Sequence, residues 1–119
     1  MAMIVTPESL FRILADITRL RAILLMQSEG ELCVCELTHA LDTIQPKISR
    51  HLAVLRAQDI VLDRRAGQWV YYRLNPDLPD WARTVIEATA AEVLKAAPFR
   101  EDHAALRSMP NRPGTRSIT

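Results

Sequence analysis

The sequence predicts a mainly α-helical domain that carries a single β-hairpin, and three observations lead to this fold class. Apolar residues recur at helical spacing over most of the chain before residue 58. The pattern then changes, because residues 60–74 are rich in β-branched and aromatic side chains and contain a glycine between two short runs. Helical spacing returns after the prolines at 76 and 79. With 119 residues, the chain is long enough for one such domain plus a tail.

Two helices are expected before residue 30. Residues 6–8 combine a capping hydroxyl, a proline suited to the first turn and an acid near the positive end of the helix dipole. A second helix is expected to start near Asp16 or Thr18 and to end at Gly30. The apolar residues of both helices are interpreted as core and dimer packing: Leu10, Phe11, Leu14, Leu20, Ile23, Leu24 and Met26.

A third and a fourth helix follow closely. The third is expected from Val34 to Leu41, and a turn over residues 42–44 separates it from the fourth. Pro46 suits the first turn of the fourth helix, which is expected to continue to about residue 58. A spacing of i, i+4 and i+7 marks its buried face, which consists of Ile48, Leu52 and Leu55.

A hairpin and a last helix complete the predicted domain. Residues 60–64 and 69–74 have the pattern of strands, and residues 65–68 connect them, with Gly67 free to adopt a positive φ. The last helix is expected over about residues 80–97, and the polar, proline-containing residues 98–119 are expected to form a disordered tail. Over residues 1–97, the order of four helices, a hairpin and a helix is that of a winged helix-turn-helix domain.

The composition is that of an ordinary soluble protein, with 49% hydrophobic and 24% charged residues. The formal net charge of +1 does not by itself indicate a nucleic-acid partner. The positions of the charged residues are more informative about such a partner than their sum. Neither a secretion signal nor a membrane span is expected, because Pro7 and Glu8 interrupt the apolar start and the run at 22–26 is too short. A cytoplasmic location, where thiols stay reduced, is therefore expected. Cys33 and Cys35 are accordingly interpreted as a ligand pair and not as a structural disulfide, which would close too small a loop to stabilise much.

The exposed face of the fourth helix carries the residues expected to contact DNA. At about 100° per residue, Arg50 lies nearly opposite the buried Ile48, and Lys47 and Ser49 flank it. Arginine can bind a guanine edge through two hydrogen bonds, whereas lysine and serine suit phosphates. Gln45, at the helix entrance, could bond a base or cap the helix.

Arg64 and Arg65 are expected at the tip of the hairpin, where arginine suits a minor groove or its phosphates. An isolated helix with a few cations is more often a solvated face. The short helix and tight turn before it, together with the basic hairpin after it, favour DNA binding instead. His51 lies towards the edge of the buried face and suits packing or hydrogen bonding at least as well as a DNA contact.

Four segments carry a resemblance to a known family. They are FRILADITRL at residues 11–20, ELCVCEL at 31–37, QPKISRHL at 45–52 and GQWVYYRL at 67–74. Together they resemble the ArsR/SmtB family of metal-sensing repressors, most closely its arsenic-responsive branch, over roughly residues 8–95. The resemblance implies a homodimer joined by its first and last helices and bound to a palindromic operator. In this family the ligand lowers the affinity for DNA and releases transcription of a resistance operon.

The chain departs from the arsenic-responsive pattern at one position. Such relatives often carry a third cysteine where this chain has Thr38, so a site of three thiolates is incomplete within the segment. A solvent oxygen, a small cellular thiol or nothing at all could take the third position. The zinc-sensing branch uses Asp and His ligands on the last helix, but here that helix contains no histidine and His103 lies in the expected tail.

Two thiolates select thiophilic ions, so arsenite or antimonite is the expected inducer, with cadmium and mercury as competitors and no cofactor needed for DNA binding. Side chains two residues apart on a regular helix point about 200° from each other. Chelation by Cys33 and Cys35 is therefore expected to need an extended or unwound first turn, which would disturb the DNA-reading helix that this turn supports.

Other interpretations of the cysteines stay open at this stage. The pair could sense oxidants, or Cys33 could be a small buried hydrophobic residue. A thiol enzyme is disfavoured because the motif lacks the two-residue spacer of thioredoxin-like sites and no βαβ pattern surrounds it. An ion carrier that never touches DNA would leave Arg50 and the basic hairpin without a purpose.

Overall fold

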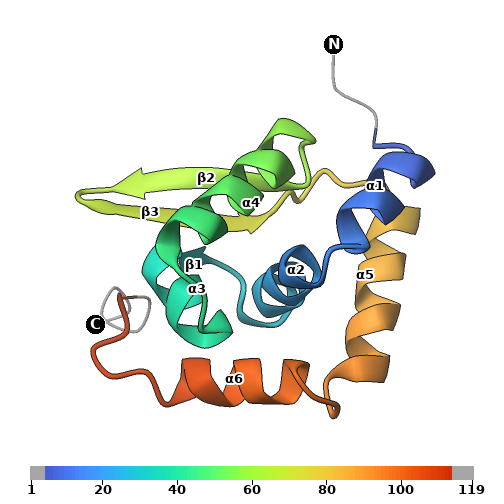
Figure 1. Ribbon diagram of the computed structural model, residues 1–119. Helices are drawn as coiled ribbons and strands as arrows, with labels where there is room; N and C mark the ends of the chain where they lie inside the picture. The colour runs from blue at the N-terminus through green and yellow to red at the C-terminus, as the bar shows by residue number, and fades with distance from the viewer. Residues whose placement is uncertain (1–4, 114–119) are drawn as a thin grey trace.

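The computed structural model describes residues 5–113, and over this range helices pack together beside a small antiparallel sheet whose hairpin projects to one side (Figure 1). The elements, in chain order, are α1 (Pro7–Leu14), α2 (Ile17–Glu29), β1 (Leu32–Cys33), α3 (Val34–Leu41), α4 (Gln45–Ala57), β2 (Val61–Ala66), β3 (Trp69–Leu74), α5 (Asp80–Val93) and α6 (Phe99–Arg107). The predicted fold class, mainly helical with a hairpin, is confirmed. None of the helices over residues 5–113 is both long and apolar enough to cross a membrane.

Local capping explains where the first two helices begin and end. The Thr6 hydroxyl accepts a hydrogen bond from the Ser9 backbone N–H at 3.2 Å, and the Asp16 carboxylate accepts one from the Arg19 N–H at 3.0 Å. Gly30 ends α2 with a φ of +87°, a conformation that favours glycine. The predicted starts and the predicted stop of these helices are therefore confirmed.

Helix α2 forms the centre of the core. Its residues Ile23, Leu24, Leu25 and Met26 are at most 1% exposed. It packs against α1 and α5 on one side and against α3, α4 and α6 on the others, as Figure 1 shows. Burial of apolar surface against this one helix joins α3, α4, β3 and the C-terminal helix α6 in a single folded unit.

The sheet has three strands in the order β1-β3-β2, all antiparallel. The hairpin of β2 and β3 was predicted, and Gly67 adopts a φ of +60° in its turn. Strand β1 was not predicted, because two residues are too few to show an alternating pattern. It places Cys33 directly opposite Tyr71 of β3.

The C-terminal part of the chain corrects two expectations. Helix α5 ends at Val93, before residue 97, and the expected disorder from residue 98 is wrong for residues 99–107, which form α6. Phe99, His103 and Leu106 recur at helical spacing and are all buried, so this segment has an apolar face that the prediction overlooked. Residues 114–119 of the expected tail lie outside the described residues.

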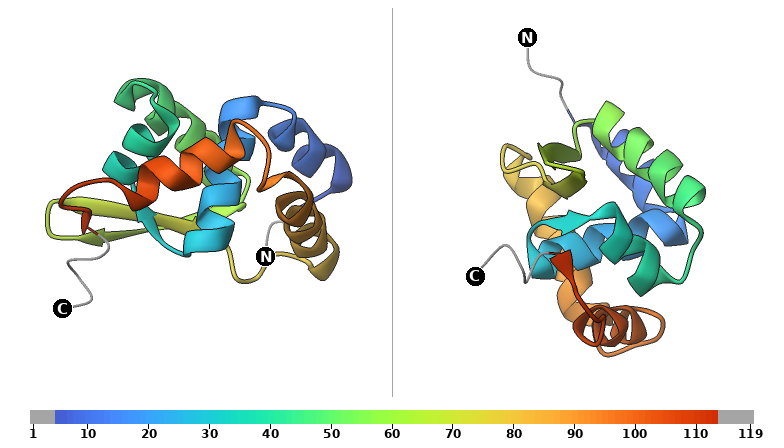
Figure 2. Two further views of the ribbon diagram at one scale, coloured as in Figure 1. Left: turned by 90° about the horizontal axis from the view of Figure 1, so that it is seen from below. Right: turned by 90° about the vertical axis from the view of Figure 1, so that its left-hand side faces the viewer.

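Two polar contacts anchor α6 from its buried side. The Asp102 carboxylate accepts two hydrogen bonds from the Arg21 guanidinium, at 2.6 and 2.9 Å. His103 hydrogen-bonds the Ser28 hydroxyl through Nε2 and the Phe99 carbonyl oxygen through Nδ1, both at 2.8 Å. Viewed from below, α6 lies across α2 and α3 (Figure 2, left). Both ring nitrogens of His103 thus have partners inside the protein.

Candidate DNA interface and thiol site

Helix α4 presents the face that was predicted to contact DNA. Ile48, Leu52 and Leu55 are buried against the core, as their spacing predicted. The opposite side is open to solvent, where Gln45, Lys47 and Arg50 are exposed and Ser49 is half-buried. Helix α3 packs against α4, so the two form the helix-turn-helix unit beside the hairpin (Figure 1).

The hairpin places its two arginines differently from the prediction. Ala66 and Trp69 close the hairpin, so its tip is formed by Gly67 and Gln68, and Arg65 is exposed just before it. Arg64 lies further from the tip, and its side chain points along the sheet instead of away from the protein. Its guanidinium donates hydrogen bonds of 2.6 and 3.0 Å to the Glu31 carboxylate.

A tyrosine ring completes the surroundings of Arg64. The guanidinium carbon lies 4.8 Å from the centre of the Tyr71 ring. The hydrogen bonds from Arg64 hold the pKa of Glu31 below its ordinary value, against the opposing effect of burial, and the same contact raises the pKa of Arg64. The Nε and Nη2 donors of Arg64 are thus engaged by a carboxylate in the DNA-free protein.

Cys33 and Cys35 meet at the start of α3, but not in the form that was expected. The structure joins their sulfur atoms in a disulfide, with the two Cα atoms 5.4 Å apart, so the expectation that the pair is not disulfide-bonded is wrong here. The sulfurs can meet because Cys33 is the N-cap residue, with extended backbone (φ −83°, ψ 164°), and only Cys35 lies within the first helical turn. The sulfurs therefore meet without the extended or unwound first turn that chelation was expected to need, because only the residue before that turn is extended.

The cysteine pair opens into a groove of about 580 Å³ between α3, the start of α4 and the end of the hairpin. Its lining residues are Cys33, Val34, Cys35, Thr38, His39, Gln45, Gln68, Trp69 and Val70. The Thr38 hydroxyl donates a hydrogen bond to the Val34 carbonyl oxygen at 2.8 Å, so its proton is directed at the helix backbone. Within residues 5–113, no three side chains of His, Cys, Asp or Glu are arranged so that they could share a metal ion.

A buried carboxylate stands behind the cysteines. The Glu36 side chain is fully buried, and its Oε1 accepts a hydrogen bond from the Cys33 backbone N–H at 2.8 Å. Its Oε2 is paired with Nε of Arg112, whose Nη2 also contacts Glu29 at 3.2 Å. Burial opposes the charge of Arg112, but these two carboxylates outweigh it and raise its pKa.

These residues were missed by sequence reasoning for different reasons. Glu36 occupies the third position after the N-cap Cys33, which is the glutamate position of a capping box, so a sequence signal was available. Arg112 was regarded as part of a solvated tail, and nothing local to its position indicates a partner 76 residues away.

His51 of α4 lies beside Asp16, the N-cap residue of α2. Its Nε2 atom is 3.9 Å from the Asp16 carboxylate, and its side chain is 17% exposed. Burial lowers the pKa of His51, although the charge of Asp16 acts in the opposite direction. Burial also opposes the charge of Asp16, but the hydrogen bond from the Arg19 N–H and the nearby cations lower the pKa of Asp16 overall. The partly buried His51 side chain thus packs next to the residue that caps α2.

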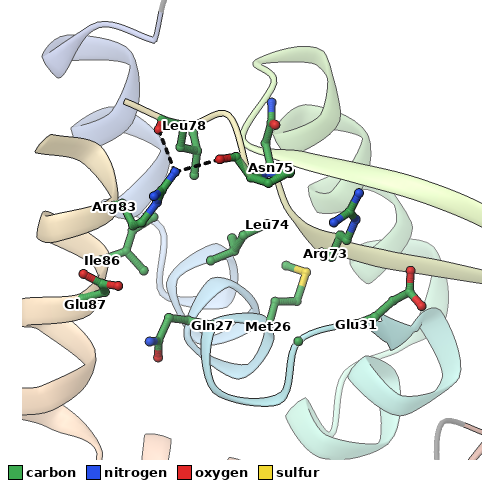
Figure 3. A pocket seen from close by; sticks show the side chains of 12 residues that line it. Met26, Gln27, Glu31, Arg73, Leu74, Asn75, Leu78, Arg83, Ile86 and Glu87 are labelled. Atoms are coloured by element: carbon green, nitrogen blue, oxygen red, sulfur yellow. Dashed lines mark hydrogen bonds between the residues drawn. The ribbon is translucent and has the colours of Figure 1, made fainter. Parts of the chain in front are cut away.

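A second cavity, of about 340 Å³, lies on the other side of the sheet between α2, β3 and α5 (Figure 3). Met26, Leu74, Leu78 and Ile86 form its apolar part. Arg83 donates hydrogen bonds to the carbonyl oxygens of Pro76 and Leu78, at 2.7 and 3.1 Å, and so ties the loop before α5 to that helix. None of the residues predicted to contact DNA or an ion lines this cavity.

Fold and surface together define a winged helix-turn-helix regulator, with an exposed cationic helix face and an adjacent hairpin. A sequence model described as "Bacterial regulatory protein, arsR family" matches residues 16–62. The chain belongs to this family of DNA-binding, non-enzymatic regulators, as its similarity to individual relatives also shows.

Two curated relatives and one solved structure illustrate this similarity. The arsenic resistance transcriptional regulator ArsR1 of Pseudomonas putida KT2440 is 61% identical over 84 residues, which are 71% of this chain and 66% of that protein. The arsenical resistance operon repressor of Escherichia coli K12 is 58% identical over 81 residues, 68% of this chain and 69% of that protein. The crystal structure of the AntR antimony-specific transcriptional repressor superposes with a TM-score of 0.61 at 25% identity, covering 76% of this chain and 85% of AntR.

Proposed function

We propose that the protein is a cytoplasmic transcriptional repressor that binds operator DNA and leaves it when arsenite or antimonite binds Cys33 and Cys35. Release then permits expression of an arsenic-resistance operon. The observation that carries this proposal is the meeting of the two sulfur atoms at the start of α3, the helix that packs against α4. After reduction of the disulfide, two thiols held this close suit one thiophilic ion. Relatives named for arsenic resistance, together with the antimony-specific AntR, support this choice of ion.

The shape of the groove supports a direct coupling between ion and DNA. Gln45 at the start of α4 and Gln68 at the hairpin tip line the same groove as the cysteines. An ion with its remaining ligands in this groove would therefore adjoin both elements that face DNA, with no need to unwind α3. A coupling of about 1–3 kcal/mol between the two sites corresponds to a 5–150-fold loss of DNA affinity, which is enough to release a repressor.

The exposed surface supports a homodimer. Phe11 on α1 is 52% exposed and Trp81 on α5 is 37% exposed, and both are large apolar side chains. Helices α1 and α5 both lie at the end of the molecule opposite the hairpin tip (Figure 1). We propose that a second copy of the chain covers this face, so that two copies of α4 address the two halves of a palindromic operator through Gln45, Lys47, Ser49 and Arg50, with Arg64 and Arg65 on the flanking hairpin.

Fluorescence anisotropy of the reduced protein on its own upstream DNA, titrated with arsenite, tests the proposal. We expect specific binding that micromolar arsenite reverses in the wild type but not in Cys33→Ser or Cys35→Ser. Thr38→Ser is the matched control, because it changes the same groove but keeps the hydroxyl that contacts Val34. Release of DNA by arsenite from both serine variants would refute the role of the pair, and absence of specific binding would refute the repressor itself.

The disulfide in the structure favours a second candidate signal, thiol oxidation. Oxidation of the two thiols to the disulfide removes two electrons and two protons, which a peroxide can accept while it is reduced to two water molecules or to water and an alcohol. Titration with arsenite in the absence of oxidant, and with peroxide in the absence of arsenite, separates the two signals. Release by peroxide alone would replace the arsenite proposal with oxidant sensing at the same pair.

A further inference from the structure

We propose that Glu36 and Arg112 are positioning residues of the Cys33–Cys35 site, so that the C-terminal arm (residues 99–113) sets the geometry in which the two sulfurs meet. This inference rests on the proposed function for its ion-binding consequence, but its structural core does not depend on the nature of the signal.

The backbone conformation of Cys33 determines whether the two sulfurs can meet. The two sulfurs can approach each other only because the Cys33 backbone is extended, which turns its side chain towards Cys35 at the first turn of α3. The Glu36 carboxylate accepts the Cys33 N–H at 2.8 Å and thereby fixes the start of the helix at this residue. Loss of this hydrogen bond would free the N-cap residue to adopt other conformations, in which the sulfurs are further apart on average.

Glu36 carries a charge that Arg112 balances. Its side chain has no exposure to solvent, and a buried carboxylate needs a partner of opposite charge to remain in place. Nε of Arg112 provides that partner, and Glu29 holds the other end of the guanidinium. Without Arg112, the Glu36 carboxylate would be more stable when hydrated. It would therefore turn towards water and no longer accept the hydrogen bond from the Cys33 N–H.

Arg112 is brought to Glu36 by the docking of α6. It reaches α3 because α6 is docked on α2 and α3 through Asp102, His103 and the buried Phe99 and Leu106. The chain then turns back so that residue 112 lies beside the start of α3. The cysteine site is therefore assembled from β1, α3 and a segment far along the chain, and it would be incomplete in a chain that ended after α5.

The test compares four variants of the whole 119-residue chain with the wild type. Arg112→Met removes the countercharge. The double variant Glu36→Gln/Arg112→Met keeps an oxygen that can accept the Cys33 N–H but carries no buried charge. Glu36→Ala/Arg112→Met also lacks the charge but has no acceptor for that N–H. Arg107→Met is the matched control, because Arg107 is an exposed arginine of the same arm.

Two readouts are compared among these forms. The first is the thiol–disulfide equilibrium of the DNA-free protein in glutathione buffers, which is measured by alkylating the free thiols and determining the mass of the protein by mass spectrometry. In this equilibrium two glutathione thiols are oxidised to glutathione disulfide, while the bond between Cys33 and Cys35 breaks and each sulfur gains a proton. The second is the arsenite concentration that releases half of the DNA, corrected for the DNA affinity of each form.

Arg112→Met and Glu36→Ala/Arg112→Met should shift the equilibrium towards the dithiol, because two less closely held thiols have a lower effective concentration for each other. Both should also need roughly tenfold more arsenite, the usual effect of losing an outer-shell partner of a ligand. Glu36→Gln/Arg112→Met and Arg107→Met should stay close to the wild type in both readouts.

The pair of double variants decides the matter if Arg112→Met fails to fold, because neither of them contains an unpaired buried charge. Equal equilibria in the two double variants would overturn the positioning role, as would an Arg112→Met protein that melts earlier but matches Arg107→Met in both readouts. If the wild type keeps its DNA in arsenite, the proposed function fails, and the glutathione equilibrium alone still accepts or rejects the positioning role.

Discussion

The variant Asp102→Ala tests whether α6 is an integral part of the folded domain. Both carboxylate oxygens of Asp102 accept hydrogen bonds from Arg21, at 2.6 and 2.9 Å, and the Asp102 side chain is only 3% exposed. Removal of one partner from a buried ion pair costs about 3–5 kcal/mol. Because the Arg21 side chain is 19% exposed, water can solvate its guanidinium in the variant. We therefore expect the variant to lose about 2–3 kcal/mol of folding stability.

Thermal unfolding followed by circular dichroism measures this loss. At about 4 °C per kcal/mol for a domain of this size, Asp102→Ala should melt roughly 10 °C below the wild type. The protein concentration must be equal in all samples, because the proposed dimer would have a Tm that depends on concentration. Trypsin should also cleave at Arg100 and Arg107 earlier in the variant, since both lie on α6.

Two further variants control the interpretation. Glu101→Ala changes the neighbouring residue, whose carboxylate pairs with Arg100 at the surface, and it should leave the Tm unchanged. Addition of Arg21→Met to Asp102→Ala removes the unpaired cation and should recover part of the loss. If Asp102→Ala melts together with the wild type and resists trypsin equally, α6 does not depend on this ion pair and the reasoning is refuted.

Three other predictions concern DNA affinity and pH. Arg50→Ala should weaken specific operator binding by about 1–3 kcal/mol and relax the sequence preference at one base pair. Lys47→Ala should instead weaken binding to all DNA sequences alike and lower the slope of log affinity against log salt concentration by about 1. Fluorescence anisotropy at several salt concentrations measures both effects. Glu31→Gln should strengthen DNA binding by a few-fold at low salt, because Arg64 no longer has to leave a carboxylate, and a gain that persists with Arg64→Ala would contradict this. Burial lowers the pKa of His51 below its ordinary 6.5, so the unfolded chain takes up the proton first as the pH falls. The free energy of unfolding should therefore decrease below that pH in urea titrations, and the decrease should be smaller in His51→Gln.

The parts of the fold that the sequence predicts are those with local causes. The start of α1 at Thr6, the end of α2 at Gly30 and the positive φ of Gly67 each follow from a residue type at its own position. Strand β1 and helix α6 depend on partners elsewhere in the chain. β1 exists because β3 pairs with it, and Asp102 of α6 is 81 residues from Arg21.

The candidate site divides in the same way. The exposed face of α4 follows from the helical period alone, since Arg50 must point away when Ile48 is buried. The meeting of the sulfurs was missed because Cys33 was treated as a helical residue, although Glu36 three positions later has the spacing of a capping box. The pairing of Arg64 with Glu31 needs the register of three strands, which no local pattern provides.

That register also gives the thiol pair a second connection to the surface proposed to face DNA. Cys33 lies opposite Tyr71 and Tyr71 opposite Arg64, so the three residues form one row across β1, β3 and β2. Arg64 stands over the ring of Tyr71 and is bound to Glu31, two residues before Cys33. Under the proposed function, a ligand that displaces Cys33 acts on β1, which pairs with Tyr71 and directly follows Glu31, while Gln45 lines the groove beside it. The proposed ion would then act on the hairpin through β1 and on α4 through the groove, because closely packed elements transmit small displacements to one another.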